Sequence, residues 1–145
     1  MDVIISVGKK FEQKKLKNVP DNIHIYPSVP QVDILEFADV FVTHGGMNSV
    51  SESIVKGTPM VVIPFVSDQP VNATQIETLG LGKRLEYKHV TSESLKQTVF
   101  SVLHDEQISS NMKQTQELIA NAPGNAGGAQ MIIAYYKKCW GITEE

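Results

Sequence analysis

A strand, a turn with two adjacent glycines and a helix are expected in succession between residues 40 and 57, and this unit constrains the fold more than any other stretch. Residues 40–42, Val-Phe-Val, form a short apolar run between polar neighbours, which is typical of a buried strand. Gly45 and Gly46 follow as the turn, and a helix begins directly after them. The backbone N–H groups at such a helix start lack intrahelical partners, and the helix dipole favours negative charge there. The unit therefore predicts an anion site, and phosphate is the anion that suits it best.

The helix after the glycine turn is predicted to be amphipathic. At about 100° per residue, one side of the helix is apolar and the other is polar. The apolar side comprises Met47, Val50 and Ile54, and the polar side comprises Asn48, Ser49 and Glu52. The run Gly57-Thr58-Pro59 ends the helix, because glycine suits a left-handed cap and proline cannot continue a helix.

The composition fits one globular domain with its own core. The chain has 145 residues, of which 41% are hydrophobic and 20% are charged. A formal net charge of −3 argues against nucleic acid as the main partner. Cys139 is the only cysteine, so no internal disulfide can form. The longest apolar run near the start, residues 3–5, is too short for a signal peptide or a membrane span. We therefore expect a cytoplasmic protein without a membrane span.

Predicted strands and helices alternate along the chain. Strands are expected at residues 3–7, 23–26, 40–43, 60–63 and 84–87. Helices are expected at residues 31–37, 47–56, 70–80, 91–103 and 108–121. A last helix is expected to begin at about residue 128 and to turn Met131, Ile132 and Tyr135 toward the core. Residues 9–18 are expected to form at best a short surface helix. This order predicts an α/β fold with a Rossmann-like, doubly wound parallel sheet. Ligands on such sheets bind beyond the carboxyl ends of the strands, so His44 and the Asp68-Gln69 loop can line one cleft.

Six short motifs occur in one order with one spacing. They are Val29-Pro30-Gln31, His44-Gly45-Gly46-Met47-Asn48-Ser49, Glu52, Gly57-Thr58-Pro59-Met60, Asp68-Gln69 and Asn72-Ala73. Together they resemble the donor-binding signature of nucleotide-sugar glycosyltransferases of the GT-B fold. The chain is most similar to the bacterial macrolide glycosyltransferase branch, which is related to the UDP-glycosyltransferases of plants and animals. The resemblance implies that residues 1–145 are the donor-binding domain in the C-terminal half of a GT-B enzyme, without that domain's first strand and phosphate-binding loop and without the acceptor-binding domain.

The resemblance also implies a role for each matching residue. Gln31 would lie near the nucleobase or ribose, and Glu52 would bind the ribose hydroxyls. His44 would contact the diphosphate, whose oxygens would also bind Asn48, Ser49 and the backbone after Gly45 and Gly46. Asp68 and Gln69 would bind hydroxyls of the transferred sugar. A carboxylate accepts well from a ribose diol and is a poor neighbour for phosphate, in agreement with the place of Glu52. Relatives often carry an aromatic residue for base stacking where this chain has Ser28.

Each of these residues also has a purely structural interpretation. His44 alone could be a core histidine, Glu52 an ordinary exposed helix residue, and Asp68 and Gln69 caps for the helix at Pro70. The sequence contains no Asp-x-Asp pair and no His, Cys and carboxylate cluster with ligand spacing, so we expect no metal or other cofactor. A Gly-x-Gly-x-x-Gly fingerprint is also absent from the sequence, which argues against a Rossmann oxidoreductase.

The sequence leads to two hypotheses for function. In the first, the chain is the donor-binding part of a glycosyltransferase that moves a hexose from a UDP- or TDP-sugar to a small hydroxyl-bearing acceptor, which binds through the other domain. The resemblance places the catalytic base in that other domain, so we expect no catalytic residue in this chain and no transfer by it alone. In the second, the chain is a non-catalytic nucleotide-sugar-binding subunit that acts when docked to a separate partner chain.

Overall fold

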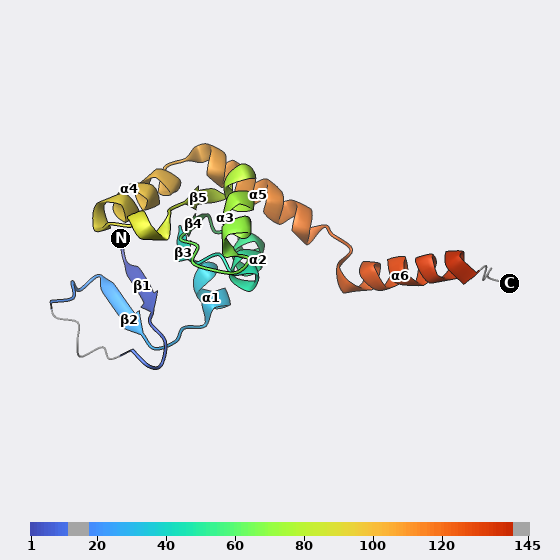
Figure 1. The fold of residues 1–145 in the computed structure, drawn as a ribbon, viewed down its shortest axis with the longest axis horizontal. Coiled ribbons are helices and arrows are strands. Elements are labelled where there is room, and N and C mark those ends of the chain that lie inside the picture. The colour runs from blue at the N-terminus through green and yellow to red at the C-terminus, as the bar shows by residue number, and fades with distance from the viewer. Residues whose placement is uncertain (12–17, 141–145) are drawn as a thin grey trace.

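The strands of the described chain are all parallel and are divided between two sheets. The computed structural model describes residues 1–11 and 18–140. One sheet pairs β1 (Val3–Ser6) with β2 (Ile23–Tyr26), and the other has the order β3 (Phe41–Thr43), β4 (Met60–Val62), β5 (Gly82–Arg84). The helices are α1 (Gln31–Leu35), α2 (Met47–Lys56), α3 (Gln69–Thr78), α4 (Ser92–Leu103), α5 (Glu106–Ala120) and α6 (Gly124–Trp140), with a 3₁₀ turn, η2, at Tyr87–His89. This α/β architecture with parallel strands is the predicted class (Figure 1).

The core forms on both faces of β4, the central strand of the larger sheet. Met60, Val61 and Val62 are fully buried, and successive side chains of a strand point to opposite faces. Met60 and Val62 belong to a cluster with residues of α2, α3 and α5, whereas Val61 packs with residues of α4 and the start of α5. Helices therefore cover both faces, which agrees with the wholly apolar sequence of β4. The cluster around Val61 includes the apolar stripe of α4, namely Leu95, Val99 and Val102.

Several element boundaries follow from short signals in the sequence. Helix α2 ends at Gly57, whose φ of +75° is the left-handed cap that was predicted. Thr91 and Ser94 form a capping box at the start of α4. Asp105 caps α5 through the N–H groups of Gln107 and Ile108. Most of the surface helix considered for residues 9–18 lies outside the described residues.

Three predictions about the strands and helices were wrong in detail. The fifth strand occupies Gly82–Arg84 and not residues 84–87, because Gly82 lets the chain approach β4: a Cβ at Gly82 would lie 2.0 Å from the Met60 carbonyl oxygen. Val42 in β3 was expected in a buried strand but is exposed, since β3 is an edge of its sheet. Met47, at the first position of α2, is also exposed, because the apolar side of α2 turns inward only from Val50.

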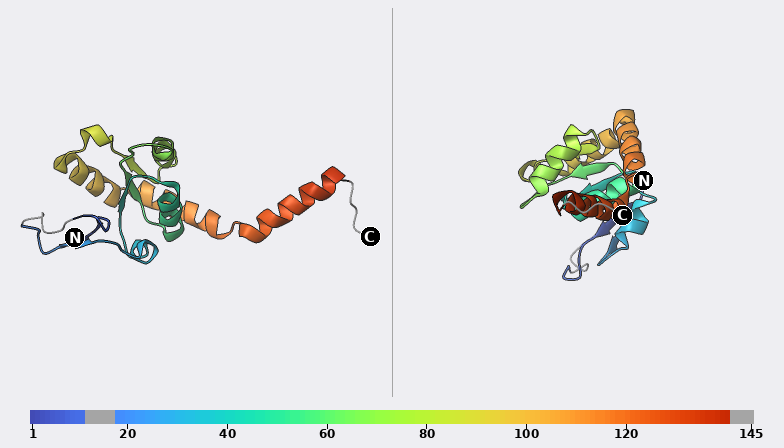
Figure 2. Two further views of the ribbon diagram at one scale, coloured as in Figure 1. Left: turned by 60° about the horizontal axis from the view of Figure 1, so that its bottom comes forward. Right: turned by 90° about the vertical axis from the view of Figure 1, so that its right-hand side faces the viewer.

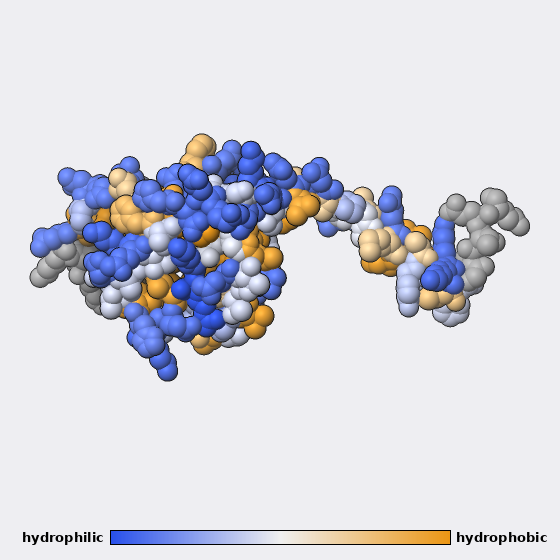
Figure 3. Space-filling view, turned by 90° about the horizontal axis from the view of Figure 1, so that it is seen from above, coloured by the Kyte–Doolittle hydropathy of each residue, from blue (hydrophilic) through white to orange (hydrophobic). Residues whose placement is uncertain are grey.

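The last helix was predicted to carry apolar residues inward, and this prediction was also wrong. Helix α6 begins earlier than expected, at Gly124, and extends away from the rest of the molecule (Figures 1 and 2). Met131, Ile132 and Tyr135 are 70%, 72% and 71% exposed, and apolar residues are visible on this isolated helix in Figure 3. Its periodicity correctly indicated a helix, but nothing in the described residues covers its apolar side. None of the helices in the described ranges is long and apolar enough to cross a membrane.

Candidate functional site

The glycine turn between β3 and α2 is fixed by close packing. Gly45 has a φ of +84°, and its N–H donates a hydrogen bond to Thr43 Oγ1 (3.3 Å). A Cβ at Gly45 would lie 2.6 Å from Val62 Cγ1, so that a side chain cannot be added there without displacing the core. A Cβ at Gly46 would lie 2.7 Å from His44 Nε2, which shows that the exposed imidazole folds back over the turn. Gly45 is therefore needed for the turn to keep this shape, whereas Gly46 has an ordinary φ of −64° and would meet only the exposed His44 side chain.

The start of helix α2 is open, as the sequence predicted. No side chain caps the helix at Gly46, and the first residue that bonds back into the helix is Val50, whose N–H donates to the Gly46 carbonyl (3.0 Å). The first turn contains no acidic residue, and Asn48 is exposed beside it. This arrangement leaves N–H groups at the positive end of the helix dipole, next to the His44 imidazole. It can hold an anion.

Gln31 contacts the polar side of α2. Its side-chain Nε2 donates to Glu52 Oε2 (2.6 Å) and lies 3.3 Å from Ser49 Oγ. The three residues are partly buried, and Gln31 in α1 is 18 residues from Ser49 and 21 residues from Glu52 in α2. The amide thereby fixes the Glu52 carboxylate through one of its oxygens, and the other oxygen has no hydrogen-bond partner among the described residues.

The position of α1 against α2 is secured at the other end of both helices. The buried Thr58 hydroxyl donates to the Leu35 carbonyl (2.7 Å), and the buried Ser53 hydroxyl donates to the Thr58 carbonyl (2.6 Å). Lys56 Nζ lies 2.8 Å from Glu36 Oε2, and this hydrogen bond and charge pair lower the pKa of Glu36 below its ordinary value. These contacts hold α1 in place, and Gln31 is at its first position.

Asp68 and Gln69 lie at the start of α3 and are arranged differently from simple helix caps. Asp68 is the N-cap residue, but its side chain makes no capping hydrogen bond. Gln69 Oε1 accepts from the backbone N–H groups of Phe65 (2.8 Å) and Val66 (3.1 Å), which closes the loop before the helix. The Gln69 amide oxygen is thus used by the loop, and its NH₂ group remains available to donate. The structural interpretation of Asp68 as a cap is wrong.

Asn72 connects the glycine turn with Asp68, a link that the sequence reasoning missed. Its buried side-chain Nδ2 donates to the Gly45 carbonyl (2.8 Å) and to Asp68 Oδ2 (3.0 Å). Asn72 was recognised as part of a motif but was given no role. The available signal was its spacing of four residues from Asp68, which places the two side chains on the same side of a helix.

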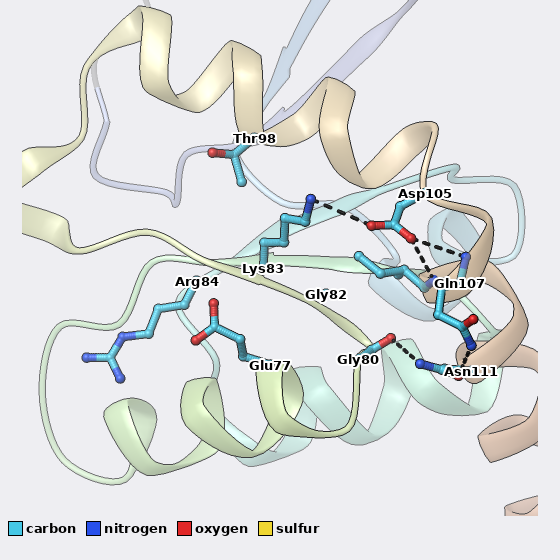
Figure 4. A pocket seen from close by; sticks show the side chains of 10 residues that line it. Glu77, Gly80, Gly82, Lys83, Arg84, Thr98, Asp105, Gln107 and Asn111 are labelled. Carbon is cyan, nitrogen blue, oxygen red and sulfur yellow. Dashed lines mark hydrogen bonds and ion pairs between the residues drawn. The ribbon is translucent and has the colours of Figure 1, made fainter.

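Hydrogen bonds therefore join most of the predicted side chains at the site into two groups. One group is Gln31, Ser49 and Glu52, and the other is Gly45 and Asp68, linked through Asn72. Ser49 and Glu52 lie on the helix after β3, Asp68 lies in the loop after β4, and Gln31 is at the start of α1 after β2. A separate hollow lies at the opposite end of β5, between α3, α4 and α5; it is lined by Lys83 and Asp105 among others (Figure 4). None of the predicted donor residues lines this hollow.

A parallel α/β domain with helices on both sheet faces and polar residues at the strand carboxyl ends belongs to the nucleotide-binding class of folds. Comparison with known proteins identifies the family within that class. The chain belongs to the UDP-glucoronosyl and UDP-glucosyl transferase family, whose model matches residues 5–124. The predicted resemblance is thereby confirmed.

Three relatives illustrate the match. The chain is 41% identical over 136 residues to NDP-glycosyltransferase YjiC of Bacillus subtilis (strain 168), covering 94% of this chain and 35% of that protein. It is 30% identical to oleandomycin glycosyltransferase of Streptomyces antibioticus, covering 91% and 31%. The crystal structure of the glycotransferase of kitacinnamycin superposes with a TM-score of 0.84 at 32% identity, covering 90% and 34%. The chain spans about a third of the length of these relatives, and it corresponds to their C-terminal domain.

Proposed function

We propose that this chain is the donor-binding domain of a glycosyltransferase that transfers a hexose from a UDP- or TDP-sugar to a small hydroxyl-bearing acceptor. The observation that carries the proposal is the convergence of the two bonded groups on the open start of α2. The open helix start can bind the diphosphate, and polar groups on either side of it can bind the nucleoside and the sugar of a nucleotide sugar. The acceptor and the catalytic base belong to a further domain of the whole enzyme.

The geometry supports a distinct task for each part of the site. The diphosphate lies at the start of α2 against His44, the backbone after Gly45 and Gly46, and the side chains of Asn48 and Ser49. The ribose hydroxyls donate to the free oxygen of Glu52, whose other oxygen is occupied by Gln31. The transferred sugar contacts the carboxylate of Asp68 and the NH₂ group of Gln69. Gln31 accordingly acts near the ribose and orients Glu52.

The proposed function also concerns the metal requirement and the cellular location of the protein. We propose donor binding without a metal ion, since the sequence has no Asp-x-Asp pair to chelate one beside the diphosphate. We also propose a cytoplasmic location. A lone cysteine, Cys139, suits a reducing compartment because it cannot form an internal disulfide.

The diphosphate is expected to contribute more to affinity than the nucleobase does. Ser28, exposed before α1, offers no aromatic surface, and stacking of a base on an aromatic side chain contributes about 1–3 kcal/mol. Calorimetric titration with uridine, thymidine, adenosine and guanosine diphosphates, with a metal chelator present, should give dissociation constants within roughly a hundredfold of one another. A larger preference for one base would contradict this expectation, and failure of all four to bind would contradict the proposed function.

Replacement of Glu52 by Gln should weaken binding of uridine diphosphate more than binding of its 2′-deoxy form. The proposed partner of the carboxylate is the ribose diol, and a hydrogen bond to a charged group contributes about 1.5–3 kcal/mol, or roughly a tenfold to hundredfold change in affinity. Glu77→Gln is the matched control, because Glu77 is an exposed carboxylate near the C-terminal end of α3, away from the proposed donor residues at the start of that helix. Equal weakening of both nucleotides would mean that Glu52 only holds Gln31 and the helix.

A non-catalytic nucleotide-sugar-binding subunit is the second candidate, and the exposed apolar side of α6 favours it as far as docking is concerned. In both candidates another domain or chain supplies the acceptor site. They differ in whether sugar transfer follows once that domain or chain is present.

A further inference from the structure

Asn72 is buried between two parts of the proposed site and is not itself among the residues expected to touch the donor. We propose that Asn72 is a positioning residue that couples the diphosphate-binding glycine turn to the sugar-binding carboxylate of Asp68. The inference rests on the proposed function and adds to it a reason why both ends of the donor are recognised together. It is carried by two hydrogen bonds from one side-chain amide.

The orientation of the Asn72 amide is determined by its partners. Both are acceptors without a proton, namely the carbonyl oxygen of Gly45 and a carboxylate oxygen of Asp68. Only the NH₂ group can face them, and it has one N–H for each. Since the side chain is only 8% exposed, water cannot easily replace either bond, and an acceptor left without its donor there is costly.

Asn72 also determines the direction of the Asp68 carboxylate. An aspartate at the N-cap position normally accepts from the backbone N–H groups of the first helical turn. Asp68 makes no such bond, and its backbone is in the helical region (φ −77°, ψ −13°) and not in the extended conformation of a usual cap. One carboxylate oxygen instead accepts from Asn72, one turn further along α3, and the residue as a whole is exposed. The second oxygen is therefore free to accept from a sugar hydroxyl in a direction set by Asn72.

The other bond of Asn72 holds the turn that presents the diphosphate contacts. The Gly45 backbone is fixed on one side by its N–H bond to Thr43 and by contact with Val62. Its carbonyl is fixed on the other side by Asn72. His44 and Gly46 flank Gly45 directly, so a shift of this carbonyl would move the imidazole and the start of α2. One amide thereby sets the distance between the diphosphate contacts and the sugar carboxylate.

The test uses the isosteric variant Asn72→Asp, which places an acceptor oxygen against both partners. We expect affinity for UDP-glucose to fall by about tenfold to a hundredfold at pH 7.5, because a hydrogen bond to a charged group is lost and repulsion replaces it. We also expect the ratio of affinities for UDP-glucose and UDP to approach one, since the sugar contact of Asp68 is no longer oriented.

A pH series separates positioning from mere loss of structure. The introduced carboxyl group is buried beside Asp68, and both burial and the like charge raise its pKa. At pH 5 it is more often protonated and can donate one hydrogen bond again. The affinity of the variant relative to wild type, measured at each pH, should therefore recover as the pH falls. Because protonation would also restore the stability of a variant destabilised by the buried charge, thermal unfolding is measured at the same pH values, and the recovery in affinity counts only where the variant is folded throughout.

Asn111→Asp is the matched control. Asn111 Nδ2 also donates to a glycine carbonyl, that of Gly80 (3.3 Å), but it does so in the hollow at the other end of β5 (Figure 4). This variant should keep its affinity for UDP-glucose and its UDP-glucose to UDP ratio. Thermal unfolding of both variants shows whether either has lost its fold.

A double-mutant cycle keeps the proposal testable if Asn72→Asp does not fold. Asn72→Ala should reduce the sugar contribution in the wild-type background and have no further effect on it when Asp68 is already Ala. An equal effect of Asn72→Ala in both backgrounds would overturn the inference. If wild type binds no nucleotide at all, the proposed function fails instead, so the two failures are distinguishable.

Discussion

Purified by itself, this polypeptide is expected to bind a nucleoside diphosphate and to transfer no sugar. Transfer requires a base to take the proton of the acceptor hydroxyl as that oxygen attacks the anomeric carbon, and a positioned base contributes about 10²–10⁴-fold in rate. His44 lies over the glycine turn, and in the proposed function it contacts the diphosphate and does not act as the base for the acceptor. Holding the two reactants together contributes roughly a further 7–11 kcal/mol, and the proposed function assigns the acceptor pocket to another domain.

An assay with UDP-glucose and a panel of phenolic and macrolide acceptors should therefore show slow hydrolysis at most. Nucleotide binding by the same preparation, measured by calorimetry, is the control that shows an intact donor site. Acceptor-dependent release of diphosphate that disappears in a His44→Ala variant would contradict the expectation. That outcome would mean that residues 1–145 contain a complete active site.

Replacement of Gly45 by Ala should destabilise the domain and abolish nucleotide binding. An L-residue in the left-handed conformation of Gly45 costs roughly 1–2 kcal/mol. The added Cβ would also meet Val62 Cγ1 at 2.6 Å, and overpacking of a core costs about 1–3 kcal/mol. The free energy of unfolding should therefore fall by about 2–5 kcal/mol, because Val62 lies in the central strand and cannot move aside.

Gly8→Ala provides a matched control for this substitution. Gly8 has a similar φ of +79°, but a Cβ there would meet nothing within 4 Å. Urea unfolding should show a loss of no more than about 1–2 kcal/mol for Gly8→Ala, together with unchanged nucleotide affinity. Equal shifts of the unfolding midpoint in the two variants would mean that the contact with Val62 has no energetic weight.

The sequence was most informative where a local pattern determines the structure. The apolar run at residues 60–63 predicted the strand β4, which is buried on both faces, and the run Gly57-Thr58-Pro59 predicted the end of α2. The glycine turn predicted an open helix start, because strand, turn and helix are adjacent in the chain and their geometry depends on few distant contacts. Hydrogen bonds join some of the signature residues, namely Gln31 with Ser49 and Glu52, and Asn72 with Gly45 and Asp68.

What the sequence could not provide depends on contacts between distant segments. Asn72 bonds to a carbonyl 27 residues earlier, and no local pattern indicates such a bond. The hydrogen bonds of Gln69 to the loop before α3 were likewise invisible, because an amide can serve a ligand or the backbone equally well. The apolar residues of α6 gave the periodicity of a packed helix, but periodicity does not say which surface covers the helix.

The division of the strands into two sheets has a consequence for local unfolding. The β1–β2 pair is a two-stranded ribbon whose side chains Ile4, Ile5 and Tyr26 are exposed, and such a ribbon is only marginally stable in water. The β3–β4–β5 sheet instead contains the fully buried β4 and helices on both faces. Opening of the ribbon therefore costs much less free energy than opening of the larger sheet, and its backbone amides exchange with solvent without global unfolding. The residues from His44 onward that we propose to bind the donor lie with the larger sheet and its helices, so we expect the nucleotide site to persist while the β1–β2 pair opens and closes.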